Sequence, residues 1–208
     1  MKIVVISDTH NNHKDIAIEE CDLLIHCGDA TTYGTYKEQK SFFDWFSRLE
    51  VKHKIYVPGN HDVLMEGLDR QAVYGIHILK NRSITLGGIK FCGSPYFSRP
   101  KRIVIEERSK HDSFRVLYTK AKEKIFIEDC DIRITHSPPY GMLDIVEGTR
   151  RGCEILQEIT QETKARYHLF GHIHSGYGKF ITEDTIFINA AQCNDDNELV
   201  NTPIVICI

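Results

Sequence analysis

The sequence predicts an α/β fold built from short strands and amphipathic helices. Runs rich in β-branched residues recur along its 208 residues, and most are bounded by Gly, Pro, Asn or Asp, as strands usually are. Longer segments between several of these runs carry apolar side chains at helical spacing. Strands that alternate with helices favour an α/β architecture, and a chain of this length suits a single domain spanning residues 1–208.

Nine runs are predicted strands. In chain order they are Ile3–Ile6, Asp22–His26, Lys54–Val57, Ile76–Leu79, Ile89–Cys92, Asp131–Thr135, Tyr167–Phe170, Thr185–Asn189 and Ile204–Ile208. Several are apolar without alternation, which is typical of strands covered on both faces. Three segments are predicted helices because their apolar side chains recur every three or four residues. These segments are Thr35–Leu49, Ile105–Phe126 and Cys153–Arg166.

Composition and charge exclude several classes of function. The net charge of -3 gives no basic face for an extended nucleic-acid interface. No apolar run approaches the roughly 18 residues of a membrane span, and the N-terminal run is too short for a signal peptide. The seven cysteines are dispersed without a CxxC pair, which indicates reduced thiols. We therefore expect a cytoplasmic protein that makes no membrane contact.

Polar side chains gather directly after five of the predicted strands. They are Asp8 and His10, then Asp29, then Asn60 with His61 and Asp62, then His136, and finally His172 with His174. In open α/β sheets, ligands bind beyond the carboxyl ends of the strands, where loops far apart in sequence can meet. Taken singly, the His-x-His corner is more often a polar turn, and an aspartate after a strand is more often a cap. Their joint occurrence, each behind its own strand, favours one shared site.

Seven of these side chains are candidate metal ligands: Asp8, His10, Asp29, Asn60, His136, His172 and His174. Imidazole, carboxylate and amide oxygen without thiolate favour Zn, Fe, Mn or Ni over a structural all-sulfur site. Seven ligands exceed the four of tetrahedral zinc, so two divalent ions that share a carboxylate are the natural number. Such an ion pair can hold the attacking and leaving oxygens of a phosphoryl displacement.

The ordered motifs DTH, GD, GNHD, TH and GHIH resemble the calcineurin-like metallophosphoesterase family, from residue 3 to about residue 190. The segments ITHSPPYGMLD, RRGCEILQEI, HLFGHIHSGYG and FINAAQCN are similar to its branch of small phosphodiesterases and metallophosphoesterase-domain proteins. The sequence departs from the family at Asn11, where relatives usually carry glycine. The resemblance implies two mixed β-sheets packed as a sandwich with flanking helices, and a hydrolase with a binuclear metal centre.

The resemblance also assigns the ligands to two ions. One ion is bound by Asp8, His10, Asp29 and His174; the other is completed by Asn60, His136 and His172, and Asp29 bridges both. Mn, Fe or Zn are the expected metals, with Ni, Co or Mg as alternatives. Gly171 and Gly176 would let the backbone come close to the site.

The resemblance implies catalytic roles for the two residues that follow Asn60. His61 would serve the leaving oxygen as an acid or an electrostatic stabiliser, oriented by Asp62, and the nucleophile would be a metal-bridging hydroxide. The implied substrate is a small nucleotide or a similar phosphodiester. Arg150 and Arg151 are candidates to contact its phosphate, with solvated loop positions as the alternative reading.

Two other functions remain open. A phosphomonoesterase that acts on nucleotides or phosphoproteins would use the same ions. A catalytically silent protein-binding scaffold would predict lost ligands or a replaced His61, whereas the motif set here is intact. A homodimer is compatible with the sequence, although nothing in it locates an interface.

Overall fold

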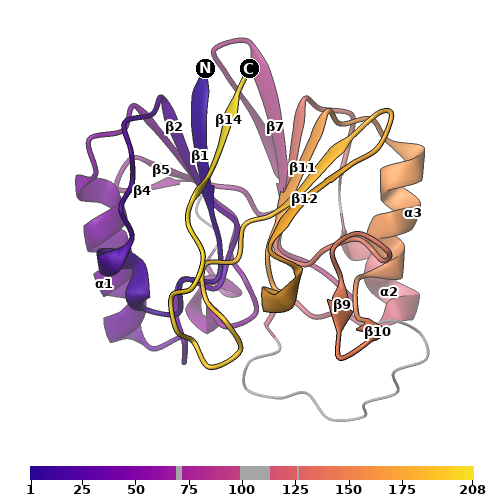
Figure 1. Ribbon diagram of the computed structural model, residues 1–208, viewed down its shortest axis with the longest axis horizontal. Coiled ribbons are helices and arrows are strands. Elements are labelled where there is room, and N and C mark those ends of the chain that lie inside the picture. The colour runs from indigo at the N-terminus through magenta and orange to yellow at the C-terminus, as the bar shows by residue number, and fades with distance from the viewer. Residues whose placement is uncertain (69–71, 99–112, 126) are drawn as a thin grey trace.

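Two mixed β-sheets pack face to face, and helices cover their outer surfaces (Figure 1). The computed structural model describes residues 1–68, 72–98, 113–125 and 127–208. One six-stranded sheet has the order β14-β1-β2-β3-β5-β4, and the other has the order β12-β13-β11-β8-β7-β6. This is the predicted α/β class, in the two-sheet form that the family resemblance implies.

The bounds of the elements are as follows. The first sheet contains β1 (Lys2–Ile6), β2 (Leu23–His26), β3 (His53–Tyr56), β4 (Ala72–Val73), β5 (Ile76–Ile78) and β14 (Ile204–Cys207). The second contains β6 (Arg82–Leu86), β7 (Ile89–Ser94), β8 (Ile132–Thr135), β11 (Tyr167–Phe170), β12 (Gly178–Ile181) and β13 (Ile186–Asn189). A small hairpin is formed by β9 (Ile145–Val146) and β10 (Thr149–Arg150). The helices are α1 (Tyr36–Arg48), α2 (Tyr118–Lys124) and α3 (Glu154–Glu162), with 3-10 turns η1 (Asn12–Asp15), η2 (Val63–Met65) and η3 (His174–Gly176).

Each sheet has four parallel strands at its centre and one antiparallel strand at each edge. Parallel strands are buried on both faces, which explains their continuous apolar runs. In β1, Ile3 and Val5 share a buried cluster with Ile134 of the opposite sheet. The alternate residue Val4 lies in a second cluster with Phe42 of α1. The main core therefore lies between the sheets, and α1 seals the outer face of the first sheet (Figure 1).

All nine predicted strands are present, with ends within two residues of the predicted positions. The α1 helix is also confirmed, and it begins after Thr35, whose hydroxyl accepts a hydrogen bond from the amide of Glu38. The predicted extension of α3 to Arg166 is wrong. Thr163 is already extended, and the amide of Arg166 instead donates to the carbonyl of Asp131 at 3.0 Å, which leads the chain into β11.

The predicted helix Ile105–Phe126 is only partly testable, because residues 105–112 and 126 lie outside the described residues. Within the described part the helix begins at Tyr118, so the prediction is wrong for residues 113–117. Phe97 donates its amide to Phe114 and accepts from Val116, so this stretch runs alongside Phe97 rather than coiling. Phe114 is fully buried, and its φ of 61° lies in the left-handed region, which a right-handed helix excludes. No helix in the described ranges has the length and apolar character needed to cross a membrane.

Candidate metal centre

The seven predicted ligands lie together where parallel strands of both sheets end. Asp8 and His10 follow β1, Asp29 follows β2, Asn60 follows β3, His136 follows β8, and His172 and His174 follow β11. The side chains of Asp8 and Asp29 are almost completely buried, and His136 is inaccessible to solvent. Carboxylates and imidazoles thus lie together, away from bulk water, where the parallel strands of the two sheets end.

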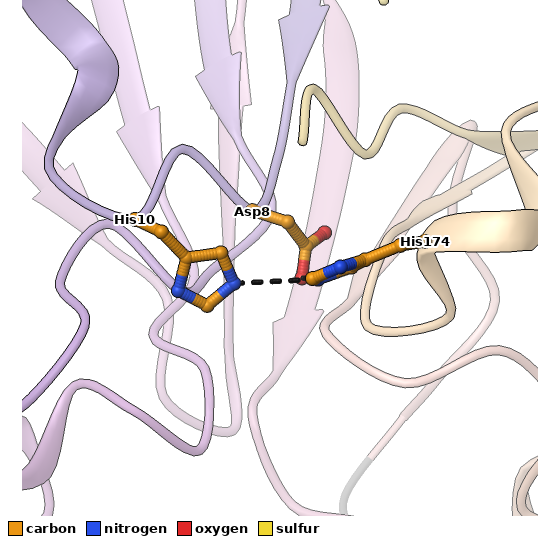
Figure 2. A group of neighbouring side chains, drawn as sticks. All are labelled: Asp8, His10 and His174. Atoms are coloured by element: carbon orange, nitrogen blue, oxygen red, sulfur yellow. Dashed lines mark hydrogen bonds and ion pairs between the residues drawn. The ribbon is translucent and has the colours of Figure 1, made fainter. Parts of the chain in front are cut away.

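These side chains form two clusters. The Asp8 cluster consists of Asp8, His10 and His174, and the Asp29 cluster consists of Asp29, His136 and His172. Within each cluster the potential ligand atoms lie within 4.8 Å of one another. Figure 2 shows His10 and His174 facing each other beside the Asp8 carboxylate, with residues contributed by both halves of the chain. His172 and His174 flank the buried Ile173 and belong to different clusters.

Backbone carbonyl groups fix the orientation of three of the imidazole rings. In each ring Nδ1 hydrogen-bonds a carbonyl oxygen: His10 with Thr31 at 3.2 Å, His136 with Cys27 at 3.0 Å, and His174 with Asn194 at 2.8 Å. A carbonyl oxygen can only accept, so Nδ1 must carry the proton. Each Nε2 therefore turns toward its cluster, and metal-binding histidines commonly have such a carbonyl partner.

The facing atoms require a positive charge between them. The Nε2 atoms of His10 and His174 are 3.3 Å apart, and in the neutral rings both would present lone pairs. Likewise, Nε2 of His136 lies 2.9 Å from Oδ1 of Asn60 and 3.2 Å from Oδ2 of Asp29. A proton or a metal ion relieves this repulsion. The donor types and their convergence therefore fit two divalent cations.

Protonation of two histidines compensates the buried carboxylates when only protons are available. Burial lowers the pKa of His136, but the Asp29 carboxylate, the charge of Asp8 and the carbonyl of Cys27 together raise it to about 9. Burial also opposes the charge on His174, but the hydrogen bond and charge of Asp8, with the carbonyl of Asn194 and the charge of Asp29, raise its pKa to about 9. Burial raises the pKa of Asp8, yet the hydrogen bond from His174 and the charge of His136 hold it below its ordinary value. The site thus favours bound positive charge.

Metal loading is expected to release about two protons near pH 7, because His136 and His174 must lose them before they can bind an ion. Since both pKa values are raised to about 9, the protons compete with metal below that pH. Apparent metal affinity should therefore rise as the pH increases toward 9 and then level off. Calorimetric titrations with Zn²⁺ in buffers of different ionisation enthalpy measure this release. Heats that do not depend on the buffer would contradict it.

Several residues of the site adopt left-handed backbone conformations that favour glycine. The φ angles are 50° at Asp8, 40° at His10, 71° at Asn11, 56° at Asp29 and 69° at His172. Such conformations cost free energy for residues with a Cβ atom and cluster at functional sites. The surrounding fold therefore holds the ligands in place against local backbone preference.

Glycines let the two carboxylates approach the neighbouring backbone. A Cβ atom at position 59 would lie 2.2 Å from Oδ1 of Asp29, and one at position 171 would lie 2.0 Å from Oδ2 of Asp8. The expected close approach at Gly171 is thus confirmed. At Gly176 the closest atom to such a Cβ would be the carbonyl oxygen of Leu143, at 2.1 Å, rather than a ligand atom.

His61 lies beside the Asp8 cluster. Its ring is 4.9 Å from that of His10 between centroids, and its Nδ1 donates to the carbonyl of Thr32 at 2.6 Å. Its backbone amide donates to Oδ1 of Asp29 at 2.8 Å. The Nε2 of His61 is thus the ring atom suited to meet a substrate.

Asp62 organises the backbone around His61. Its carboxylate accepts the amides of Asp29 and Gly59 at 2.8 Å each, and of Thr31 at 3.1 Å. The hydroxyl of Thr31 contacts both Oδ1 of Asp62 and the carbonyl of His61. Asp62 thus supports the backbone of this loop, while the Thr32 carbonyl accepts the hydrogen bond from the His61 ring. A role of Asp62 in orienting His61 stays a prediction.

Two supporting residues were not among the predicted site residues. The Nδ1 of His26 accepts the amide of Gly28, and its Nε2 then donates to the hydroxyl of Thr9, between Asp8 and His10. Asn194 holds His174 through its backbone carbonyl. Burial lowers the pKa of His26 to about 3, so this ring stays neutral in its supporting role.

The two candidate phosphate-binding arginines lie in or next to the β9–β10 hairpin. Arg150 pairs with the buried carboxylate of Asp144 at 2.8 Å, and the amides of Gly141 and Gly152 donate to the same carboxylate. Arg151 is exposed, and its amide donates to the carbonyl of Asp144. These contacts give Arg150 a structural role in the hairpin, and substrate contact by either arginine stays a prediction.

Comparisons with known proteins identify the family of this chain. Residues 1–176 match the sequence model described as calcineurin-like phosphoesterase. The UPF0046 protein K07C11.7 of Caenorhabditis elegans is 32% identical, and the match covers 100% of this chain and 75% of the worm protein. The human metallophosphoesterase domain-containing protein 1 is 31% identical, over 99% of this chain and 70% of its own length.

A solved structure shares the fold. The crystal structure of TT1561 of Thermus thermophilus superposes with a TM-score of 0.61, over 90% of this chain and 88% of that chain. The two sequences are 14% identical, so the similarity concerns the fold alone.

Proposed function

This chain belongs to the calcineurin-like phosphoesterase family, and we propose that it is a binuclear metal-dependent phosphodiesterase acting on a small nucleotide or a similar diester. The observation that carries the proposal is the adjacency of the Asp8 and Asp29 clusters, each drawn from both sheets. The amide of His172, a member of the Asp29 cluster, donates to the Asp8 carboxylate at 2.9 Å. His61 lies beside the Asp8 cluster and is tied to Asp29 through its amide. Two candidate ion sites and His61, which could assist a leaving oxygen, thus lie at the same end of the two sheets.

The Asp8 cluster would hold one ion and the Asp29 cluster, with Asn60, the other. Bound divalent cations would neutralise phosphoryl oxygens and lower the pKa of water. Two divalent ions against two carboxylates leave a charge of about +2, which suits an anionic phosphate. His61 would donate from Nε2 to the leaving oxygen, because its Nδ1 is committed to Thr32. Asp29 would serve both ions, because its Oδ2 faces His136 of its own cluster and its charge also acts on His10 of the Asp8 cluster.

A diester is favoured over a monoester by the charge available around the site. A monoester dianion would benefit from a further cationic side chain. Arg150, a sequence candidate for that role, forms an ion pair with Asp144 in the hairpin. A diester carries one negative charge and does not need this further cationic side chain, so the pairing of Arg150 with Asp144 is compatible with a diester.

Two substrates with the same leaving group test the proposal. Protein reconstituted with Mn²⁺ should hydrolyse bis(p-nitrophenyl) phosphate with a higher kcat/KM than p-nitrophenyl phosphate. Because both release p-nitrophenolate, the ratio reports recognition of the phosphoryl group rather than leaving-group chemistry. A panel of cyclic nucleotides and linear dinucleotides then identifies the substrate class. A reversed preference would favour the phosphomonoesterase, and no turnover with two bound ions would favour the protein-binding scaffold.

A further inference from the structure

A hydrogen-bond network outside the predicted site connects His61 to the first turn of α1. We propose that the side chains of Glu38, Asn11 and Thr32 form a positioning network that sets the His61 ring against the leaving group. This inference rests on the proposed phosphodiesterase function. None of the three residues belongs to the Asp8 cluster or the Asp29 cluster, so their role is distinct from metal binding.

Thr32 is the point at which the network meets the site. Its carbonyl accepts from Nδ1 of His61 at 2.6 Å, and its hydroxyl donates to the carbonyl of His10 at 3.1 Å. The rings of His61 and His10 are 4.9 Å apart between centroids and nearly perpendicular. Thr32 therefore sets the position of His61 relative to His10, a member of the Asp8 cluster.

Asn11 extends this connection to α1. Its amide nitrogen donates to Oγ1 of Thr32 at 2.9 Å and to Oε1 of Glu38 at 2.7 Å, which uses both of its hydrogens. Its φ of 71° lies in the left-handed region, where a non-glycine residue carries a backbone cost. The two hydrogen bonds offset that cost and give this asparagine a role that glycine could not fill.

Glu38 does more than cap the helix. A capping box needs two hydrogen bonds, one from the amide of Glu38 to the Thr35 hydroxyl and one from the amide of Thr35 to the Glu38 carboxylate. Both are present. The same carboxylate also accepts the amide of Tyr33 at 3.3 Å and the side chain of Asn11. Hydrogen bonds to a carboxylate are stronger than neutral ones. Glu38 thus anchors the segment from residue 32 to residue 35 to a rigid helix.

Such a network matters because proton donation depends on position. A group that assists a leaving oxygen must lie within hydrogen-bond reach of it, and small displacements reduce its contribution steeply. The loss should grow with the basicity of the leaving group, because a weakly basic phenolate departs with little help. A defect in metal binding or folding would slow all leaving groups alike.

The test compares Thr32→Val, which removes the hydroxyl at nearly constant shape, with Thr32→Ser, which keeps it. Turnover is measured on methyl aryl phosphates whose leaving groups are p-nitrophenol and unsubstituted phenol. We expect Thr32→Val to reduce kcat roughly 10–100-fold with the phenol substrate and much less with p-nitrophenol, at unchanged KM and two bound ions. Thr32→Ser should restore the wild-type ratio. Thr160→Val is the matched control, because its hydroxyl bonds a backbone carbonyl in the remote helix α3.

A second measurement does not depend on activity. In zinc-loaded protein, the nuclear magnetic resonance signal of the His61 Nδ1–H group should shift or broaden in Thr32→Val and stay in place in Thr32→Ser. Equal rate losses for both leaving groups, or an unaltered His61 signal in active Thr32→Val, would overturn the network. A wild-type protein without diesterase activity would overturn the proposed function, and with it the leaving-group role. In that case the His61 signal would still show whether Thr32 holds the ring.

Discussion

Replacement of His61 by alanine is expected to lower turnover of a linear dinucleotide by roughly 10²–10⁴-fold, the range typical of lost acid catalysis. Both ions should stay bound, because the ring of His61 hydrogen-bonds Thr32, and the hydrogen bond to Asp29 comes from the backbone amide of His61. The alanine variant keeps that amide. The measurement is kcat on metal-reconstituted protein, together with metal analysis of the same samples.

Substrates with different leaving groups distinguish two possible roles of His61, as a proton donor and as a stabiliser of charge. If the ring donates a proton, the loss should be much smaller with bis(p-nitrophenyl) phosphate, since p-nitrophenolate is a stable anion. If the ring stabilises charge on the phosphoryl group, both substrates should suffer comparably. His53→Ala is a suitable control, because His53 lies at the start of β3, the strand whose other end leads into the loop that carries His61. Unchanged turnover in His61→Ala would remove this residue from the mechanism.

The central strands were predictable from the sequence, whereas three of the edge strands were not. Strands such as β1 and β8 are buried on both faces, so their continuous apolar runs stand out. The unpredicted β4, β6 and β12 all lie at sheet edges. Three of the four residues of β12 are exposed, and exposed residues separate the half-buried residues of β6, so neither strand forms a continuous buried apolar run. An edge strand forms through backbone hydrogen bonds to one neighbouring strand. These bonds require no particular side chains, so the sequence pattern of an edge strand is weak.

The candidate ligands were predictable because each follows a strand and carries a distinctive side chain. The groups that orient them were not, because several are backbone carbonyls. The carbonyls of Thr31, Cys27 and Asn194 fix three imidazole rings, and any residue could supply such an atom. Only the fold determines which carbonyl lies next to which ring. The position of Thr32 beside His61 has the same origin, since 29 residues separate the two in the chain.

Asp29→Ala is expected to reduce the metal content of the protein below one equivalent, because the proposed bridging carboxylate would serve both ions. Oδ2 of Asp29 lies 3.2 Å from Nε2 of His136, and Oδ1 accepts the amide of His61. Without this charge, the main cause that raises the pKa of His136 disappears, and burial then favours the neutral ring. Diesterase activity should be lost together with the ions.

Asp29→Asn separates charge from shape, since the amide oxygen can still accept from His61 while the negative charge is gone. Asp144→Asn is the matched control, because Asp144 is equally buried and also accepts backbone amides, but belongs to neither cluster. Elemental analysis after dialysis against a defined free-metal concentration gives the stoichiometry, and thermal melting shows whether each variant is folded. Two full equivalents in a folded Asp29→Ala variant would contradict a bridging role. One equivalent would confine Asp29 to the ion of its own cluster, since only a carboxylate shared by both ions weakens both when it is removed.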